Sequence, residues 1–173
     1  MKLEFFVNGM PKTAGSKRAF MRPGMRFPVV VEDCKDSKDW RGDVKTFAVK
    51  AIHEQNWKGE FGDFVLGPVR VRFSFTFPRP KSHYRTGKNA HLLRDDAPTC
   101  HTGRPDCLKL SRAVEDALTG IVWKDDAQIC AEFLTKEYGD KPGVEIVIET
   151  IEQPQVQVVA KTEAHAGQER LAI

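Results

Sequence analysis

The sequence lacks three features that would assign it to a class at once. No run of apolar residues approaches the roughly 20 that a membrane-spanning helix needs, and the apolar run at the N-terminus is too short for a secretory signal. The four cysteines form no CxxC pair and no dense framework, which argues against a disulfide-stabilised secreted domain. We therefore expect a soluble, cytoplasmic protein without a membrane partner, and with reduced thiols.

The chain also lacks a strong charge imbalance. Its 27 Lys and Arg residues face 24 Asp and Glu residues, a net charge of +3 that permits a nucleic-acid partner without requiring one. With 173 residues and 40% hydrophobic content, the chain is long enough to bury one core. The distribution of the charges, rather than their sum, must indicate the function.

Five segments have the residue pattern of β-strands. They are 2–9, 28–33, 67–78, 127–139 and 143–152. The clearest is 67–78, in which apolar residues alternate with polar ones. The last two flank the turn sequence GDKPG, so we expect them to pair as a hairpin.

Two segments have helical periodicity. The first runs from about Asp39 to Trp57, with Asp36 or Ser37 as its expected N-cap, and the second runs from Asp106 to Gly120. These elements predict an α+β fold, a mixed β-sheet of about four to five strands packed against two main helices. The apolar positions expected to face the core are Trp40, Val44, Phe47, Ala48, Ala51, Ile52, Trp57, Leu110, Ala113, Val114, Ala117, Leu118 and Trp123.

Two loops, 10–27 and 79–105, are rich in basic residues, Gly and Pro. Loops of such length in a compact domain are usually functional, and their cations are suited to phosphate contacts. For any single cation, a solvated surface is the better explanation, whereas the two sets together favour DNA. The predicted DNA contacts are Lys12, Lys17, Arg18, Arg22, Arg26, Arg79, Lys81, His83, Arg85, Lys88, Arg104 and Lys109. We expect one domain over 1–152 and a disordered tail over 153–173.

Carboxylates gather in the segment 104–129. Each has a structural explanation: Asp106 as an N-cap, Asp116 as an i,i+4 partner of Arg112, and Asp125–Asp126 as a turn. Together they offer the oxygen ligands that Mg²⁺ prefers, beside basic loops that could hold a phosphate backbone. This combination is typical of metal-dependent phosphodiester cleavage.

The segment RPDCLKLSRAVEDALTGIVWKDDAQI, residues 104–129, resembles the core motif of RusA-type Holliday junction resolvases. The segments VNGMPKTAGSKR and FPRPKSHYRTGK extend the resemblance over roughly residues 1–150. It implies a RusA-like fold and a homodimeric endodeoxyribonuclease, largely of phages and prophages, that cleaves four-way or branched DNA. The implied cofactor is Mg²⁺, with Mn²⁺ as an alternative, and the implied location is the cytoplasm of a bacterial or phage-infected cell.

The resemblance also implies roles for single residues. Asp106 matches the first metal-binding aspartate, and Asp126, next to Asp125, matches the later essential aspartate; Arg112 stands where the family has a catalytic lysine. The departure is Leu108, which occupies the place of the second aspartate in the pattern Asp-x-Asp-Asn. The implied catalytic residues are thus Asp106, Arg112 and Asp126, and the candidate metal ligands are Asp106, Glu115, Asp125 and Asp126.

Leu108 leaves alternatives open. Glu115 lies two helical turns further on, on the same side, and could replace the missing carboxylate, as could Asp116. Otherwise the protein is a catalytically impaired, structure-selective DNA-binding protein. A third alternative is a zinc-binding module that uses His91, Cys100, His101 and Cys107, although their spacing lacks the paired ligands of common zinc sites.

Overall fold

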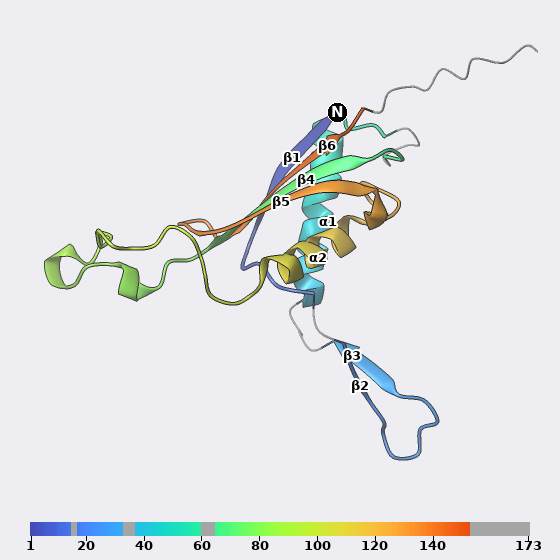
Figure 1. The fold of residues 1–173 in the computed structure, drawn as a ribbon, viewed down its shortest axis with the longest axis horizontal. Coiled ribbons are helices and arrows are strands. Elements are labelled where there is room, and N and C mark those ends of the chain that lie inside the picture. The colour runs from blue at the N-terminus through green and yellow to red at the C-terminus, as the bar shows by residue number, and fades with distance from the viewer. Residues whose placement is uncertain (15–16, 33–36, 60–64, 153–173) are drawn as a thin grey trace, which may run out of the picture.

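The structure is a computed structural model that describes residues 1–14, 17–32, 37–59 and 65–152. Its centre is a four-stranded sheet in the order β1-β6-β4-β5 (Figure 1). The strands are β1 (Lys2–Asn8), β4 (Val69–Phe77), β5 (Ile129–Tyr138) and β6 (Gly143–Thr150). β6 pairs antiparallel with both β1 and β4, whereas β4 and β5 are parallel. The expected α+β fold with a mixed sheet is confirmed.

Two helices cover one face of this sheet. They are α1 (Ser37–Glu54), which packs along β1, and α2 (Cys107–Leu118), which packs on β5 and against α1. α1 ends before Trp57, but that side chain is buried, as are Trp40 and Trp123. α2 ends one residue before Thr119, and Gly120 follows in the left-handed conformation (φ +78°) that favours glycine after a helix. None of the helices in these ranges is long and apolar enough to cross a membrane.

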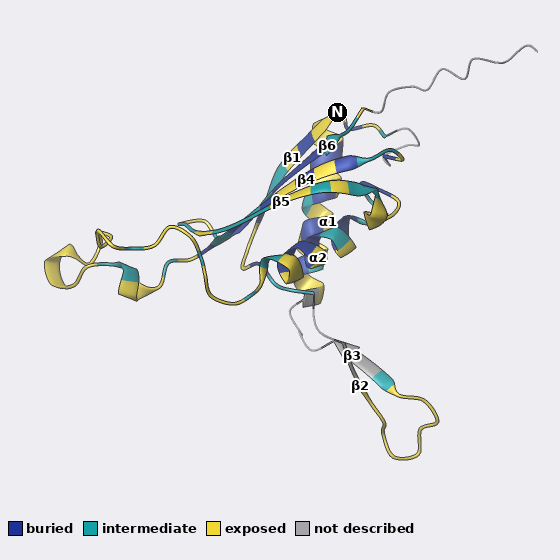
Figure 2. Ribbon diagram, viewed as in Figure 1, coloured by how far each residue is buried: buried dark blue, intermediate teal, exposed yellow. Residues whose placement is uncertain are grey.

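The alternation along β4 determines which face of the sheet is covered. Val69, Val71, Phe73, Phe75 and Phe77 are all buried beneath the helices, and the residues between them lie on the open face (Figure 2). By the same register, the odd-numbered positions of β1 and the even-numbered positions of β5 face the helices. Beyond the irregularity at the start of β5, these even positions are Glu132, Leu134, Lys136 and Tyr138, so this edge strand directs charged side chains toward α2.

The expected hairpin of β5 and β6 is wrong. Both strands pair with β4, which lies between them, and the turn 139–142 carries the chain across the end of β4. The backbone N–H of Gly139 donates to the carbonyl oxygen of Phe77 at 2.9 Å, which fixes this crossing. β4 has an unbroken apolar set on one face, so the central position buries more of its surface than an edge position would.

Two segments project from this body. One is an antiparallel hairpin of β2 (Lys17–Phe20) and β3 (Val29–Glu32), so the expectation of an irregular loop over 10–27 was wrong for β2. The other spans 79–105 and is a loop, as expected, with two short 3-10 turns, Lys81–His83 and Gly87–Asn89. Both projections are largely exposed (Figure 2). The predicted tail, 153–173, and the predicted N-cap Asp36 lie outside the described residues.

Phe73 provides a test of this core. Phe73→Ala removes a fully buried ring from the centre of β4 and should lower the free energy of unfolding by about 3–5 kcal/mol, measured by urea titration. The control is Phe133→Ala, because Phe133 lies on the neighbouring strand but is 60% exposed on the open face. That change should stay within about 0.5 kcal/mol. Equal losses at both positions would contradict the assignment of faces.

Candidate metal and nucleic-acid site

Asp106 lies at the N-cap position of α2, but its side chain makes no capping hydrogen bond. Its carboxylate is exposed, and the nearest cation along the helix is Lys109, whose Nζ lies 3.7 Å from Oδ2. An exposed ion pair of this kind contributes little to stability. The carboxylate of Asp106 is therefore available at the start of α2 rather than committed to its backbone.

The two consecutive aspartates before β5 have different environments. Asp125 caps the 3-10 turn Asp126–Gln128, accepting a hydrogen bond from the N–H of Ala127 at 2.9 Å. Gln128 accepts from the N–H groups of Lys124 and Asp125, and its Nε2 donates to the carbonyls of Val65 and Gly67. With its ends held in this way, the turn directs Asp126 rather than Asp125 into the neighbouring pocket.

That pocket joins α2 to β5. It has a volume of about 380 Å³, and its acidic lining residues are Glu115, Asp126 and Glu132. The hydroxyl of Ser111, which is buried one turn before Glu115, lies within hydrogen-bonding distance of both glutamates. A serine hydroxyl has one proton to donate, so it can satisfy only one ionised carboxylate. The other carboxylate therefore has to be satisfied by water, by a proton or by a cation.

This crowding changes the acidity of Glu115. Burial raises the pKa of Glu115 to about 7, and the hydrogen bond and negative charge of Glu132, with the charge of Asp126, act in the same direction. The hydrogen bond from Ser111 opposes them. A metal-free pocket therefore holds a proton that a carboxylate in water would have lost by pH 5.

A divalent cation would relieve the same repulsion. The donors are hard carboxylate oxygens on the wall of an open pocket, which suits Mg²⁺ with several retained waters. Among the described residues, no three His, Cys, Asp or Glu side chains are grouped so that together they could hold a metal ion. The residues thus fit an ion held by a few carboxylates and water, and not a caged structural metal.

The other residues of the α2 motif are more dispersed. Asp106 does not line the pocket, and it precedes Glu115 by nine residues, roughly 13 Å of helix. Leu108 is 72% exposed. Arg112 is exposed and makes no ion pair with Asp116, which instead lines a separate pocket beside Lys38 and Lys45 of α1.

The zinc alternative finds no support within the described chain. His101 packs between the rings of Phe77 and Tyr138, with centroids 4.4 and 4.8 Å away. No metal-binding group of His and Cys forms there. His101 is thus part of an aromatic cluster at the base of the 79–105 loop.

Lys136 connects β5 to the segment before Asp106. Its Nζ donates to the carbonyl oxygens of Gly103 and Pro105, each at 2.6 Å. In addition, the backbone N–H of His101 donates to the carbonyl of Lys136 at 2.9 Å. Because charge-assisted bonds are stronger than neutral ones, Lys136 fixes the path by which the chain enters α2.

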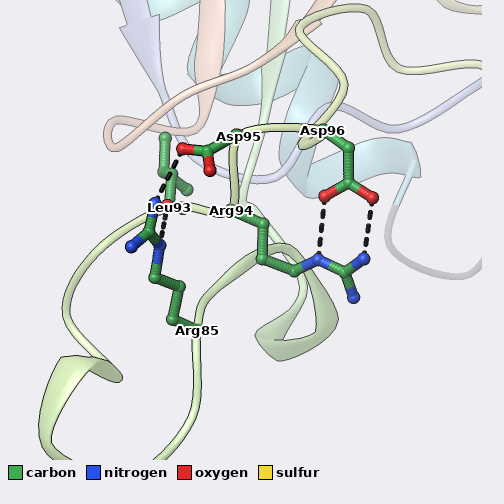
Figure 3. A network of polar contacts seen from close by, with 5 residues as sticks. All are labelled: Arg85, Leu93, Arg94, Asp95 and Asp96. Carbon is green, nitrogen blue, oxygen red and sulfur yellow. Dashed lines mark hydrogen bonds and ion pairs between the residues drawn. The ribbon is translucent and has the colours of Figure 1, made fainter.

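Two arginines of the 79–105 loop form ion pairs with aspartates of the same loop. Arg85 donates to Asp95 at 2.7 Å and to the carbonyl of Leu93, and Arg94 binds Asp96 through two hydrogen bonds (Figure 3). The bond from Arg94 lowers the pKa of Asp96. The predicted DNA contact at Arg85 is therefore already occupied by a carboxylate.

Seven more of the predicted DNA contacts lie in three places. Lys81 is exposed in the same loop, and the half-buried His83 packs edge-on against Tyr138. Arg104 and Lys109 are exposed beside Asp106, where the N–H of Ala14 donates to the carbonyl of Lys109 and brings the segment of Lys12 to α2. The backbones of Lys17 and Arg18 belong to β2, and their side chains lie outside what the structure describes.

Sequence reasoning missed Glu132, although a signal was present. The sequence pattern of segment 127–139 predicts a strand, and its positions 132 and 136 share a face with Leu134 and Tyr138. Charged residues on the face that should meet a helix indicate either an error of register or a polar site. Here they indicate the site.

The raised pKa of Glu115 predicts how the stability of the metal-free protein depends on pH. The folded state retains the Glu115 proton up to about pH 7, whereas the unfolded chain releases it near 4.5. Between these values the folded state binds more protons, so its stability falls as pH rises. Glu115→Gln should remove this loss, leaving the variant more stable than the wild type at pH 8 in EDTA.

The measurement is urea unfolding in EDTA at pH 5, 6, 7 and 8. Glu137→Gln is the matched control, because Glu137 is an exposed carboxylate of β5 outside the pocket. The wild type and the control should lose stability together across this range while Glu115→Gln does not. Parallel curves for all three proteins would show that Glu115 is not protonated in the folded state.

Comparison with known proteins identifies the family of this chain. The family model described as "Endodeoxyribonuclease RusA" matches residues 12–149, which include every acidic residue of the pocket. The uncharacterized protein YqaN of Bacillus subtilis (strain 168) is 28% identical over 154 residues, covering 86% of this chain and 96% of YqaN. Since the family model covers most of the sequence, the chain belongs to the RusA family of endodeoxyribonucleases, the Holliday junction resolvases.

Proposed function

We propose that this protein is a metal-dependent endodeoxyribonuclease that cleaves four-way or branched DNA junctions. The observation that carries the proposal is the carboxylate pocket of Glu115, Asp126 and Glu132. Family membership supports the reaction, and the pocket supports the cofactor, Mg²⁺ with Mn²⁺ as an alternative. The bound ion would supply charge neutralisation at the phosphate and a water activated for attack.

Residues of the chain would bind the ion, orient its ligands and contact the DNA phosphates. Asp126 and Glu115 would hold the ion together with water, and Ser111 would orient Glu115 and Glu132. Asp106 and Arg112 are exposed on α2, where Asp106 would orient water near the start of the helix and Arg112 would contact the scissile phosphate. Lys12, Arg104 and Lys109 would position the DNA backbone near the start of α2.

We further propose that two copies act together as a homodimer in the cytoplasm, with residues 1–152 as the nuclease domain. A two-fold axis would present two equivalent sites to opposing strands of a junction. Family membership supports this assembly, which light scattering of the purified protein would test directly.

Leu108 favours one alternative function. It is exposed on α2 at the position that the family pattern gives to a carboxylate, so the protein could bind junctions and cut them poorly. Incubating a labelled four-way junction and a matched linear duplex with Mg²⁺, Mn²⁺ or EDTA separates the two functions. Metal-dependent nicks in the junction alone support the nuclease, and tight binding without nicks at any metal or pH supports the alternative.

The neighbouring aspartates provide the sharpest test of the metal site. Asp126→Asn removes a charge from the pocket and should reduce junction cleavage by at least about 100-fold while junction binding persists. Asp125→Asn makes the same charge change one residue earlier but retains an oxygen that can cap the turn, so cleavage should stay within about threefold. If Asp126→Asn cuts like the wild type, or if both variants fail equally, Asp126 is not a distinct ligand.

Leu108→Asp should strengthen the site. Because Leu108 is largely exposed, the substitution should cost little stability, and its carboxylate would lie on the same side of α2 as Glu115, two turns before it. We expect the Mg²⁺ concentration for half-maximal cleavage to fall by about tenfold, as one added ligand charge would produce. Val49→Asp, an exposed apolar position on α1, is the control and should leave this concentration unchanged. An unchanged requirement in Leu108→Asp would place position 108 outside the metal site.

A further inference from the structure

The end of the β2–β3 hairpin has an unusual surface. We define the hairpin tip as residues 20–27, FMRPGMRF, which turns through Gly24 at φ +85°. Its four large apolar side chains are all exposed: Phe27 at 74%, Met21 at 61%, Met25 at 50% and Phe20 at 41%. Single exposed apolar residues are common, but four within eight residues indicate a surface that another molecule covers.

The charge of the hairpin indicates what kind of molecule this is. The segment from Lys17 to Pro28 contains four cations and no carboxylate. Two of these cations are in the tip itself, where the guanidinium of Arg22 lies 5.6 Å from the centre of the Phe20 ring and Arg26 is exposed. A polyanion that also presents flat apolar surfaces fits this mixture, and DNA bases with their phosphates have both properties.

The position of the hairpin connects it to the site. The chain that leads into β2 is bonded to α2, because the N–H of Ala14 donates to the carbonyl of Lys109, next to Asp106. From there the hairpin extends away from the sheet and both helices (Figure 1). Ten residues separate Ala14 from Gly24, a span of up to roughly 33 Å, so the tip can reach the branch of a junction whose backbone lies at α2.

The hairpin also has little support of its own. Among the described strands, β2 and β3 pair only with each other, apart from the main sheet. An isolated two-stranded hairpin is marginally stable in water. A partner that binds the apolar tip would therefore also stabilise the folded hairpin.

We propose that the hairpin tip is a wedge that inserts apolar side chains, Phe27 and Met21 foremost, between bases at the branch point of a DNA junction, while Arg22 and Arg26 contact the flanking phosphates. This inference rests on the proposed function, and it adds a means of selecting branched DNA. Bases at a branch are already partly unstacked, so a wedge costs less energy there than in a continuous duplex.

The test uses the full-length protein and a four-way junction with 2-aminopurine at the branch, in EDTA so that no strand is cut. Fluorescence of this base increases when it is unstacked, and wild-type protein should increase it severalfold at saturation. The double variant Met21→Ser/Phe27→Ser should lose most of this rise, weaken junction binding by at least about fivefold, and change linear-duplex binding by less than about twofold. Phe133→Ser makes the same kind of change at an exposed site on β5 and should retain the full signal.

A second variant tests the cations. Arg22→Gln/Arg26→Gln should weaken binding to junction and duplex alike and reduce the slope of log affinity against log salt by about 2, one unit for each phosphate contact. Circular dichroism of all variants establishes that they are folded. A tip variant that keeps the fluorescence rise and wild-type affinity overturns the wedge.

Four further outcomes also overturn it. If the tip variant loses only self-association, the tip binds a second copy of this chain, and if it loses only binding to anionic vesicles, the tip binds lipid. If wild-type protein cuts junctions in Mg²⁺ but gives no fluorescence rise, the wedge alone fails. If the wild type neither binds nor cuts junctions, the proposed function fails with it.

Discussion

One serine hydroxyl stands between two glutamates in this protein, and much of the candidate site depends on that contact. Ser111 and Glu115 lie one turn apart on α2, and Glu132 reaches them from β5. A single donor satisfies only one of two ionised carboxylates, so a proton or a cation bound in the pocket would relieve their repulsion. Burial and the neighbouring carboxylates raise the pKa of Glu115, and the same repulsion would favour a divalent ion there.

This contact between Ser111 and Glu132 depends on the register in which the edge strand β5 pairs with β4. β5 is parallel to β4, and this pairing places its even positions under α2. Glu132 and Lys136 are then two residues apart on the same face, one facing the pocket and the other binding the carbonyls that precede Asp106. Neighbouring residues in the turn before β5 also have different roles. Asp125 and Gln128 form hydrogen bonds with the backbone, and Asp126 faces the pocket.

The two basic projections, the 79–105 loop and the β2–β3 hairpin, would contact parts of a DNA substrate outside the carboxylate pocket. The 79–105 loop stiffens itself with Arg–Asp pairs and backbone bonds, so fewer of its cations are open to DNA than their number suggests. The β2–β3 hairpin instead combines cations with exposed apolar side chains. Phosphate contacts alone give affinity without shape selection, whereas an apolar tip can sense unstacked bases. The two projections therefore suit different parts of a branched substrate.

The sequence by itself determined the periodic elements, the buried faces of both helices and β4, and the family. These depend on local patterns of 2 and 3.6 residues and on a contiguous motif, all of which are visible in one dimension. Only the tertiary structure decided that β4 separates β5 from β6, that Asp125 caps while Asp126 faces the pocket, and that Glu132 joins Glu115. Strand order and the meeting of side chains from distant segments depend on how the buried faces pack together, and no local pattern encodes that packing.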